Sequence, residues 1–576
     1  MQNKFIRVNT KTKEIKILDV PEKYRFHGKR GLVDRFLIDE VPPQCDPLGP
    51  ENKLIFCTGT FGGSTFPVTG RMSAGGKSPL TGTIKEASVG GMIGPYMANQ
   101  GIKMIALDDK PDDSAEWQIL LIDGDGKPSL ISAAEYMGLG TYAVCEKMFA
   151  KYGKNIAIMT LGPAGEKMYR SAAIMVAEMD TGFPCRAVGR GGLGALLGSR
   201  KIKAMVIEKA KNKVNFEYAD RERFLAAQKK FVETCKTHPR IKQLQELGSS
   251  SVLNSTSQVG VVPHRNFSGL PLSEENKTNF TATKYRETVL ASGGKTGCAC
   301  HPGCIVKCSN VFHGKNGEYL TAGLEYETVA LFGSNIENYD FHEVAKLDRI
   351  CDDIGVDTIE MGCALGVCME GGKIKWGDTV GAAALLEEMR AGTEFGKLLG
   401  DGTESVGKAL GVTRIPTVKK QGMPAYDPRG FKGLGITYAV STQGADHTFG
   451  IVMGPPMKDE ELPGLAIESQ ITTAIANDFF CLFGNGILLA DPTIIPDLYA
   501  GTFGGEWSMD RLREMAKETL RIERKFNEGA GFRDKDDRLP EFCLKAEPQF
   551  EGALPPFPIS DENVQKKMKE IYEYTA

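Results

Sequence analysis

The chain lacks the features that mark membrane-spanning, secreted and nucleic-acid-binding proteins. Its 576 residues contain no uninterrupted apolar run of the roughly 18 residues that a transmembrane helix needs. The N-terminus, Met-Gln-Asn-Lys-Phe-Ile-Arg-Val, has no apolar core of the kind found in signal peptides. The formal net charge of −3 offers no basic field for a phosphate backbone. We therefore expect no membrane span and no nucleic-acid partner.

Cysteine is scarce as well, with 14 residues that are scattered apart from a cluster at 298–308. Secreted domains held together by disulfides have a denser and more regular cysteine pattern. The sequence therefore predicts free thiols and a cytoplasmic location.

What the chain does contain is a three-plus-one set of cysteines. Cys300, Cys304 and Cys308 recur every four residues, and Cys481 lies far downstream between aromatic residues. Thiolates suit iron–sulfur clusters or zinc. Structural zinc sites usually use pairs of short Cys-x-x-Cys knuckles, so this spacing favours an iron–sulfur cluster and electron transfer. Cys298 is an alternative first ligand, and Cys481 taken alone reads as a buried core cysteine.

The composition of the chain changes near residue 211. Before this point the sequence is rich in glycine and predicts a hairpin over 3–19 and strands at 54–57, 102–107, 117–122 and 204–207. Beyond it, apolar periodicity predicts helices at 217–236, 342–354, 358–371, 380–390, 394–410 and 508–528. A polar stretch at 411–430 predicts a second boundary. The fold class expected is α+β, with a β-rich domain over 1–210 and mainly helical domains over 211–425 and 426–576.

Several glycine-rich segments in the first 210 residues also carry cationic side chains. They are Gly70-Arg71, Lys77–Gly82, Gly90-Gly91 and Arg186–Gly194. Guanidinium groups bind phosphates bidentately, and glycine lets backbone N–H groups approach an anion closely. Each segment alone reads as a surface arginine beside a turn, but the set predicts a site for an anionic cofactor. The run Ile156–Gly165 predicts a strand entering a helix, and its spacing and proline argue against a dinucleotide loop.

A third group of residues is suited to acid–base chemistry. His447 follows Gly444-Ala-Asp, and Glu325 and Glu327 lie two residues apart. The two glutamates share a face in an extended segment but not in a helix. A histidine beside a carboxylate can act as a general acid or base near neutral pH. A lone loop histidine is more often structural, so the functional interpretation depends on its occurring together with the other groups.

Taken in order, these segments resemble the aldehyde:ferredoxin oxidoreductase family, whose members are tungsten- or molybdenum-bispterin enzymes. The resemblance covers nearly the whole chain. It is carried by Leu48–Phe56, Lys77–Gly82, Arg190–Ser199, Arg265–Phe267, the cysteine cluster, Glu325–Thr328, Asp352–Asp357, Pro428–Gly430, Gly444–His447 and Cys481.

The resemblance implies a β-rich base that carries two pterins and two helical regions that cover them. Cys300, Cys304, Cys308 and Cys481 would hold a [4Fe-4S] cluster beside the pterins, and Glu327 and His447, with Glu325 nearby, would be the acid–base groups. The pterin sulfurs would hold tungsten or molybdenum, and magnesium could accompany them. The implied cofactor-binding residues are Arg71, Gly90, Gly91, Arg186, Arg190, Asp352, Asp357 and Asp478.

The chain also departs from the family pattern. The commonest triple in the family is Cys-x-x-Cys-x-x-x-Cys, whereas here the first gap is three residues and His301 lies near the expected position. The first ligand is therefore open between Cys300 and Cys298. Ala476 occupies the place of a second acidic pterin motif, with Asp478 displaced, and Gln443 stands where arginine is common. These changes leave the pterin contacts and the substrate range open on that side.

The activity implied is oxidation of an aldehyde to a carboxylic acid, with electrons passed to ferredoxin or a partner iron–sulfur subunit. We expect the substrate pocket to be lined from 311–334 and 430–460. The alternative within the family is the catalytic subunit of an aromatic acyl-CoA reductase with obligate partners. An iron–sulfur carrier or a zinc-stabilised binding protein without pterin is the alternative from another class. A homodimer and a hetero-oligomer are both open.

Overall fold

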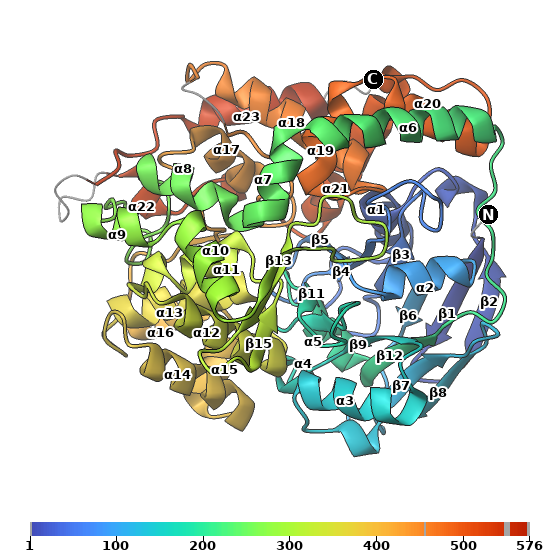
Figure 1. The fold of residues 1–576 in the computed structure, drawn as a ribbon, viewed down its shortest axis with the longest axis horizontal. Coiled ribbons are helices and arrows are strands. Elements are labelled where there is room, and N and C mark those ends of the chain that lie inside the picture. The colour runs from blue at the N-terminus through green and yellow to red at the C-terminus, as the bar shows by residue number, and fades with distance from the viewer. Residues whose placement is uncertain (1–2, 454–456, 546–552, 573–576) are drawn as a thin grey trace.

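Two six-stranded sheets form the N-terminal part of the molecule (Figure 1). The computed structural model describes residues 3–453, 457–545 and 553–572. In the first sheet the strands run in the order β2 (Ile15–Asp19), β1 (Lys4–Asn9), β6 (Ile102–Asp108), β3 (Leu54–Thr58), β4 (Met72–Lys77) and β5 (Ile84–Val89). In the second they run β11 (Arg186–Val188), β10 (Ile174–Val176), β9 (Ile156–Thr160), β12 (Ile202–Glu208), β7 (Gln118–Ile122) and β8 (Pro128–Ser132).

The two sheets share one hydrophobic core, because their central strands are apolar on both faces. Every residue of β3 and of β9 is buried, as expected for strands covered on both sides. Side chains of both sheets, such as Leu54 and Met205, meet in the common core. Helix α1 (Lys29–Glu40) packs on the outer face of the first sheet, and α3 (Thr141–Tyr152) packs on that of the second.

Helices make up most of the remaining chain and lie beside and above the sheets (Figure 1). The short helices within the sheet region are α2 (Ile93–Asn99), α4 (Pro163–Glu166) and α5 (Leu193–Ser199). The helices that follow are α6 (Arg221–Thr237), α7 (Pro239–Leu247), α8 (Leu253–Gln258), α9 (Glu274–Asn279), α10 (Ala282–Ala291), α11 (Tyr326–Leu331), α12 (Phe341–Ile354), α13 (Thr358–Glu370), α14 (Thr379–Ala391), α15 (Glu394–Gly400), α16 (Thr403–Leu410), α17 (Lys432–Val440), α18 (Leu462–Asn477), α19 (Leu482–Ala490), α20 (Ile494–Phe503), α21 (Met509–Gly529), α22 (Glu541–Leu544) and α23 (Asp561–Tyr572).

A small three-stranded sheet lies among these helices and carries the cysteine cluster. Its strands are β13 (Lys295–Cys298), β14 (Ser309–His313) and β15 (Tyr319–Ala322), and a two-stranded ribbon is formed by β16 (Thr417–Val418) and β17 (Gln421–Gly422). The loop 299–308 joins β13 to β14, so its three cysteines are fixed at both ends by paired strands.

The fold class predicted from the sequence is confirmed: a β-rich N-terminal region precedes a mainly helical remainder. The N-terminal hairpin and the four predicted strands are present. The single helix predicted at 394–410 is wrong, because α15 and α16 are separate helices. Gly402 between them has φ +98°, a conformation outside the helical region that favours glycine. The division at residues 210 and 425 stays a prediction.

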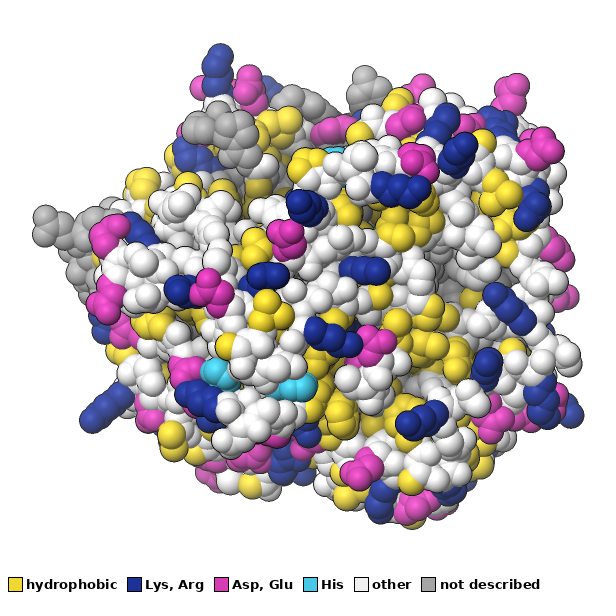
Figure 2. Space-filling model, in the orientation of Figure 1, with side chains coloured by type: hydrophobic (Ala, Val, Ile, Leu, Met, Phe, Trp, Pro, Cys, Tyr) yellow, Lys and Arg dark blue, Asp and Glu magenta, His cyan; other side chains and the backbone are white. Residues whose placement is uncertain are grey.

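Among the described residues no single helix combines the length and apolar composition needed to cross a membrane. Helices α18 and α19 reach that composition only as a pair, and the pair is bent by 102°. On the face shown in Figure 2, positive and negative side chains are interspersed, and no large field of one sign gathers there.

Candidate active site

A cavity of about 330 Å³ lies where the N-terminal sheets meet the helical regions. Its walls come from β5 and β11 on one side and from α11, α12, the start of α13 and residues 446–448, 477 and 480–483 on the other. All three predicted groups contribute to it. The sequence-predicted residues that line it are Arg71, Gly90, Arg186, Arg190, Glu325, Glu327, Asp352, Asp357, His447 and Cys481.

The segment Asp352–Asp357 is positioned by the junction of two helices. Asp352 lies in the last turn of α12, which ends at Gly355 with φ +80°. Asp357 is the N-cap of α13 and accepts a hydrogen bond from the Ile359 N–H at 2.9 Å. Glycine after a helix and aspartate before the next are the residues such a junction favours. The spacing of the motif thus places two carboxylates on one side of the cavity.

Arginine side chains from the sheet region reach the same cavity. Arg71 donates to the Ser88 hydroxyl at 3.1 Å and to the Ser88 carbonyl at 2.8 Å, which aims its remaining nitrogen at the Cys300 sulfur 4.0 Å away. Arg186 donates to the Ser309 hydroxyl and lies 3.8 Å from the Glu325 carboxylate. These two arginines therefore stand between the cavity and the cysteine loop.

Other cations in this cavity already have partners. Arg190 pairs with Asp357 at 3.1 Å and also donates to backbone carbonyls. Lys85 of β5 pairs with Asp446 at 2.7 Å, although its strand carries no sequence signal for a site. Lys29, at the start of α1, donates to the Phe480 carbonyl at 2.6 Å. These contacts tie the sheet region to the C-terminal segments that close the cavity.

Gly90 and Gly91 allow the cysteine loop to approach the sheet closely. A Cβ at Gly90 would lie 3.0 Å from the Cys300 carbonyl oxygen. Gly91, at φ +87°, donates its N–H to that same oxygen at 2.8 Å. Gly90 lines the cavity, whereas the Gly91 N–H is occupied by the protein itself. Glycine is therefore required here for a close backbone contact.

Asp352 has a buried carboxylate neighbour that the sequence analysis missed. Asp348 lies one turn earlier on α12 and lines the cavity. The Thr321 hydroxyl lies within hydrogen-bond distance of both carboxylates, 2.6 Å from Asp348 and 3.4 Å from Asp352. Burial raises the pKa of Asp348 to about 7, and burial together with the charge of Asp348 raises that of Asp352 well above its ordinary value. The sequence did carry a signal for this pair, because residues four apart, such as Asp348 and Asp352, lie on the same face of a helix. The pair can hold protons at neutral pH.

Glu327 and His447 form an ion pair in the cavity wall, with Oε1 and Nε2 3.0 Å apart. Burial raises the pKa of Glu327, but the charge and hydrogen bond of His447 outweigh it and the net pKa lies below the ordinary value. Burial alone would lower the pKa of His447. The charge and hydrogen bond of Glu327 outweigh burial, so the net pKa of His447 lies above its ordinary value. The buried Nδ1 of His447 has no hydrogen-bond partner among the described residues. When His447 is protonated, its Nδ1–H is therefore a donor that the described residues leave unused.

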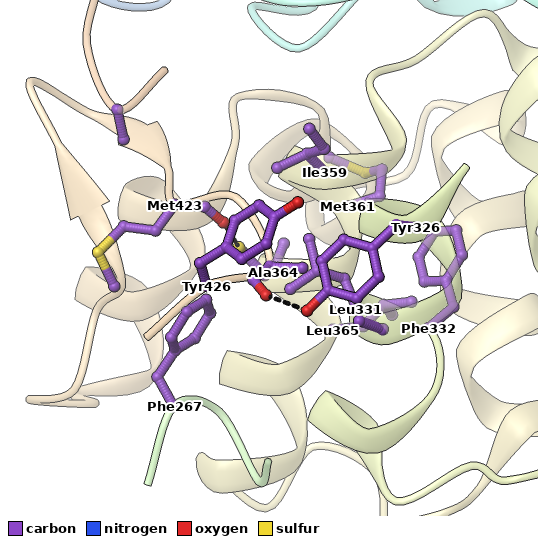
Figure 3. Packing of buried hydrophobic residues seen from close by; sticks show 14 of the residues in the cluster. Phe267, Tyr326, Leu331, Phe332, Ile359, Met361, Ala364, Leu365, Met423 and Tyr426 are labelled. Carbon is purple, nitrogen blue, oxygen red and sulfur yellow. Dashed lines mark hydrogen bonds between the residues drawn. The ribbon is translucent and has the colours of Figure 1, made fainter. Parts of the chain in front are cut away.

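The start of α11 explains how both glutamates line the cavity. Glu325 is the extended N-cap residue and Glu327 lies in the first helical turn. Tyr326 between them points into the hydrophobic core, where its ring centroid lies 4.9 Å from that of Tyr426 (Figure 3). Burial raises the pKa of Glu325 to about 7, against a hydrogen bond from Ser249. The segment is extended at Glu325 and helical at Glu327, so it is neither a continuous strand nor a continuous helix.

The cysteines of the predicted cluster gather in one place. Cys300, Cys304 and Cys308 are buried in a single hydrophobic cluster, and Cys481, the N-cap residue of α19, packs against it. The hydrogen bond from Cys304 holds the pKa of the Cys300 thiol well below its usual value, and Arg71 and Arg186 add to the effect.

His301 lies close to the predicted cluster ligands, whereas Cys298 packs elsewhere. The ligand atoms of Cys300, His301 and Cys304 lie within 4.8 Å of one another. Cys298 instead packs with Cys185 in a separate apolar cluster.

Asp478 lies close by but faces elsewhere. Its carboxylate accepts from the Gly31 N–H at 2.8 Å and lies 3.3 Å from Nδ1 of His27, and its carbonyl accepts from the Thr60 N–H. It anchors the C-terminal region to α1, and it is not among the residues that line the cavity. Its role in cofactor binding stays a prediction.

A second cavity of about 240 Å³ adjoins the first. Glu327, His447, Leu482 and Phe483 line both. The expected ranges 311–334 and 430–460 supply part of its wall. The rest comes from 238–252, Tyr426 and 482–487, which were not foreseen. Its lining consists of His238, Arg240, Ser249, Val252, Glu327, Tyr426, His447, Ile451, Met453, Leu482, Phe483, Gly486 and Ile487.

A solved structure shares the fold of the chain. It is the active site complex BamBC of benzoyl coenzyme A reductase in complex with 1,5 dienoyl-CoA, with a TM-score of 0.80 at 16% identity over 99% of this chain and 94% of that one. At this identity the likeness shows the fold alone.

Curated relatives are similar along nearly the whole chain. The tungsten-containing aldehyde ferredoxin oxidoreductase of Pyrococcus furiosus is 31% identical, covering 95% of this chain and 92% of its own length. The protein of the same name from Thermococcus kodakarensis is 28% identical over the same shares. The WOR-like subunit of an aliphatic sulfonate oxidoreductase from Pyrococcus furiosus is 25% identical over 77% of this chain and 74% of its own length.

Two family models together match most of the sequence. The aldehyde ferredoxin oxidoreductase N-terminal domain matches residues 5–209, and domains 2 and 3 of the same enzyme match 226–575. With its sheets, its thiol cluster and its cavity arranged as described, this chain belongs to the aldehyde ferredoxin oxidoreductase family of enzymes.

Proposed function

We propose that the chain is a tungsten- or molybdenum-bispterin oxidoreductase that oxidises an aldehyde to a carboxylic acid. The balanced reaction is RCHO + H₂O → RCOO⁻ + 3 H⁺ + 2 e⁻. The observation that carries the proposal is the position of the Glu327–His447 pair, which lines both a charged inner cavity and a largely apolar outer one. The names of the curated relatives support tungsten and an aldehyde substrate.

The residues of the inner cavity suit a bound bispterin. Arg71 and Arg186 offer guanidinium groups for pterin phosphates. The carboxyl groups of Asp348 and Asp352, with their raised pKa values, can both donate and accept hydrogen bonds to pterin ring nitrogens. When bound, the cofactor would supply the two-electron acceptor for the substrate.

The thiols beside this cavity suit a [4Fe-4S] cluster. Cys300, Cys304, Cys308 and Cys481 are the donor set that such a cluster takes. The separate packing of Cys298 favours Cys300 as the first ligand. In the same loop Pro302, Gly303 and Lys307 are exposed, so the cluster would lie just beneath the surface, where ferredoxin or a partner iron–sulfur subunit could accept single electrons.

The chain's own residues would orient and protonate the substrate. His447 would donate from Nδ1 to the carbonyl oxygen of the aldehyde, while its Nε2 stays bonded to Glu327, which keeps the imidazole charged. Glu325, with its pKa of about 7, can take a proton from an attacking water. The apolar wall formed by Val252, Ile451 and Ile487 would exclude bulk water.

A second candidate is the catalytic subunit of an aromatic acyl-CoA reductase. The structural likeness to the benzoyl-CoA reductase complex is the observation that favours it. This function would require partner subunits and turnover of a CoA thioester, whereas the first would act on free aldehydes.

The test is elemental analysis of anaerobically purified protein, followed by parallel assays with an aldehyde and an aromatic acyl-CoA. We expect about one tungsten or molybdenum and about four iron atoms per chain, with reduction of ferredoxin by the aldehyde. Fully loaded protein with iron or zinc but no tungsten, molybdenum or pterin would contradict the proposal. Turnover of the acyl-CoA alone would select the second candidate.

A further inference from the structure

The outer cavity contains a cation, Arg240, that has no carboxylate partner among the described residues. We infer that this cavity takes an aldehyde that carries a carboxylate at the far end of an apolar body, and that Arg240 binds that carboxylate. The inference rests on the proposed function, because it names the substrate class that the same site would accept.

Arg240 stands at the start of α7 and lines the outer cavity. Its guanidinium donates to the Gln243 side-chain oxygen at 2.7 Å and to the Ser251 hydroxyl at 3.1 Å, and both acceptors are neutral. In the part of the chain that the structure describes, no Asp or Glu oxygen lies within ion-pair distance of it. A half-buried guanidinium with neutral partners is only partly compensated for its lost hydration, so an incoming anion would be stabilised there.

Two cations of the inner cavity, Lys85 and Arg190, differ in this respect. Lys85 is paired with Asp446 and Arg190 with Asp357, at 2.7 and 3.1 Å. Those contacts hold the protein together, whereas the two hydrogen bonds of Arg240 fix its orientation and leave its positive charge unneutralised. Burial lowers the pKa of Arg240, as expected where no carboxylate offsets the loss of water.

The rest of the outer cavity defines the other two parts of the ligand. Val252, Ile451, Leu482 and Ile487 provide an apolar wall, which suits a hydrocarbon body. At another part of the wall stands the Glu327–His447 pair, whose opposite charges cancel at 3.0 Å, so Glu327 does not repel an anionic substrate. An aldehyde group at this pair and a carboxylate at Arg240 would occupy both polar regions at once.

The experiment compares hexanal with 6-oxohexanoate, which differ only by the terminal carboxylate. In the loaded wild-type enzyme kcat/KM should be higher for 6-oxohexanoate by roughly tenfold to hundredfold, as expected for a hydrogen-bonded charge pair. Arg240→Gln should bring the ratio of the two kcat/KM values close to one, and Arg240→Lys should restore part of it. Lys242→Gln, an exposed change on the same helix, should leave the ratio as in the wild type.

A binding measurement separates this inference from the proposed reaction. Calorimetry should show adipate binding at least tenfold more tightly than hexanoate to the wild type, and this difference should be lost in Arg240→Gln. Arg240-dependent binding of adipate would support the carboxylate site even if neither aldehyde is oxidised, an outcome that rejects the reaction alone. A wild-type enzyme that prefers hexanal, or an Arg240→Gln variant with an unchanged substrate ratio and unchanged adipate affinity, overturns the inference.

Discussion

The two adjoining cavities differ sharply in the chemistry of their walls. The inner one is lined by cations and acids, many of them paired with one another, and its thiol neighbours come from a loop and a distant helix. The outer one is lined mainly by aliphatic and aromatic side chains and by Arg240, for which the described part of the chain supplies no carboxylate partner. Buried charges are costly unless a ligand or partner compensates them. The difference supports the proposed division of roles, with a permanent polar cofactor in the inner cavity and an exchanging, largely apolar substrate in the outer.

The largest effect should come from removing a thiol beside the inner cavity. Cys304→Ala should reduce iron to background and lower aldehyde oxidation by more than about a thousandfold, because an incomplete ligand set cannot hold the cluster. Iron content and the cluster's visible absorption are the measurements. Cys298→Ser is the matched control and should keep its iron. Iron loss in Cys298→Ser, with retention in Cys300→Ser, would make Cys298 the first ligand.

His447, which lines both cavities, should show the next largest effect. His447→Asn should lower kcat by about a hundredfold to a thousandfold, the range for loss of an acid–base group, while tungsten and iron stay bound. Rapid kinetics together with metal analysis would check it. The control is His342→Asn, since His342 bonds Ser292 outside both cavities. Unchanged turnover would remove His447 from the chemistry.

The pH profile should report the same pair. The pKa of Glu327 lies below and that of His447 above its ordinary value, so the charged pair persists across neutral pH. Activity should fall about tenfold per pH unit as pH rises through the raised pKa of His447. On the acid side it should fall as pH drops below about 7 and Glu325, the proposed base, becomes protonated, before the lowered pKa of Glu327 is reached. The stability due to the pair should vanish in the same two directions. An alkaline limb that persists in His447→Asn would assign that limb to another group.

The smallest effect should come from the apolar wall. Ile451→Ala removes part of a half-buried side chain of the outer cavity, which should raise KM for hexanal about fivefold through lost contact area. Steady-state kinetics would measure it. The control is Leu465→Ala, whose side chain is 40% exposed and lines neither cavity. Loss of tungsten in Ile451→Ala would contradict the division of roles between the cavities.

Sequence reasoning identified the residues whose spacing or motif is itself the signal. The cysteine loop, the Asp352–Asp357 helix junction and the Glu327–His447 pair fall in this class, and the structure brings them together. Lys85 and Arg240 were missed because their relevance arises only when distant segments pack around them. The break at Gly402 was missed because helical periodicity continues across it. Asp478 resembled a cavity residue, but its carboxylate caps a contact with α1.

The bend between α18 and α19 has a consequence for how the protein is made. It places Cys481 beside the cysteine loop and Leu482 and Phe483 in the walls of both cavities. Translation proceeds from the N-terminus, so Cys300, Cys304 and Cys308 are synthesised well before Cys481. The proposed four-thiol site is therefore incomplete on the ribosome until Cys481 has emerged. Insertion of the proposed cluster would therefore follow synthesis of this bend, and any product that stops before it would lack one of the four proposed ligands.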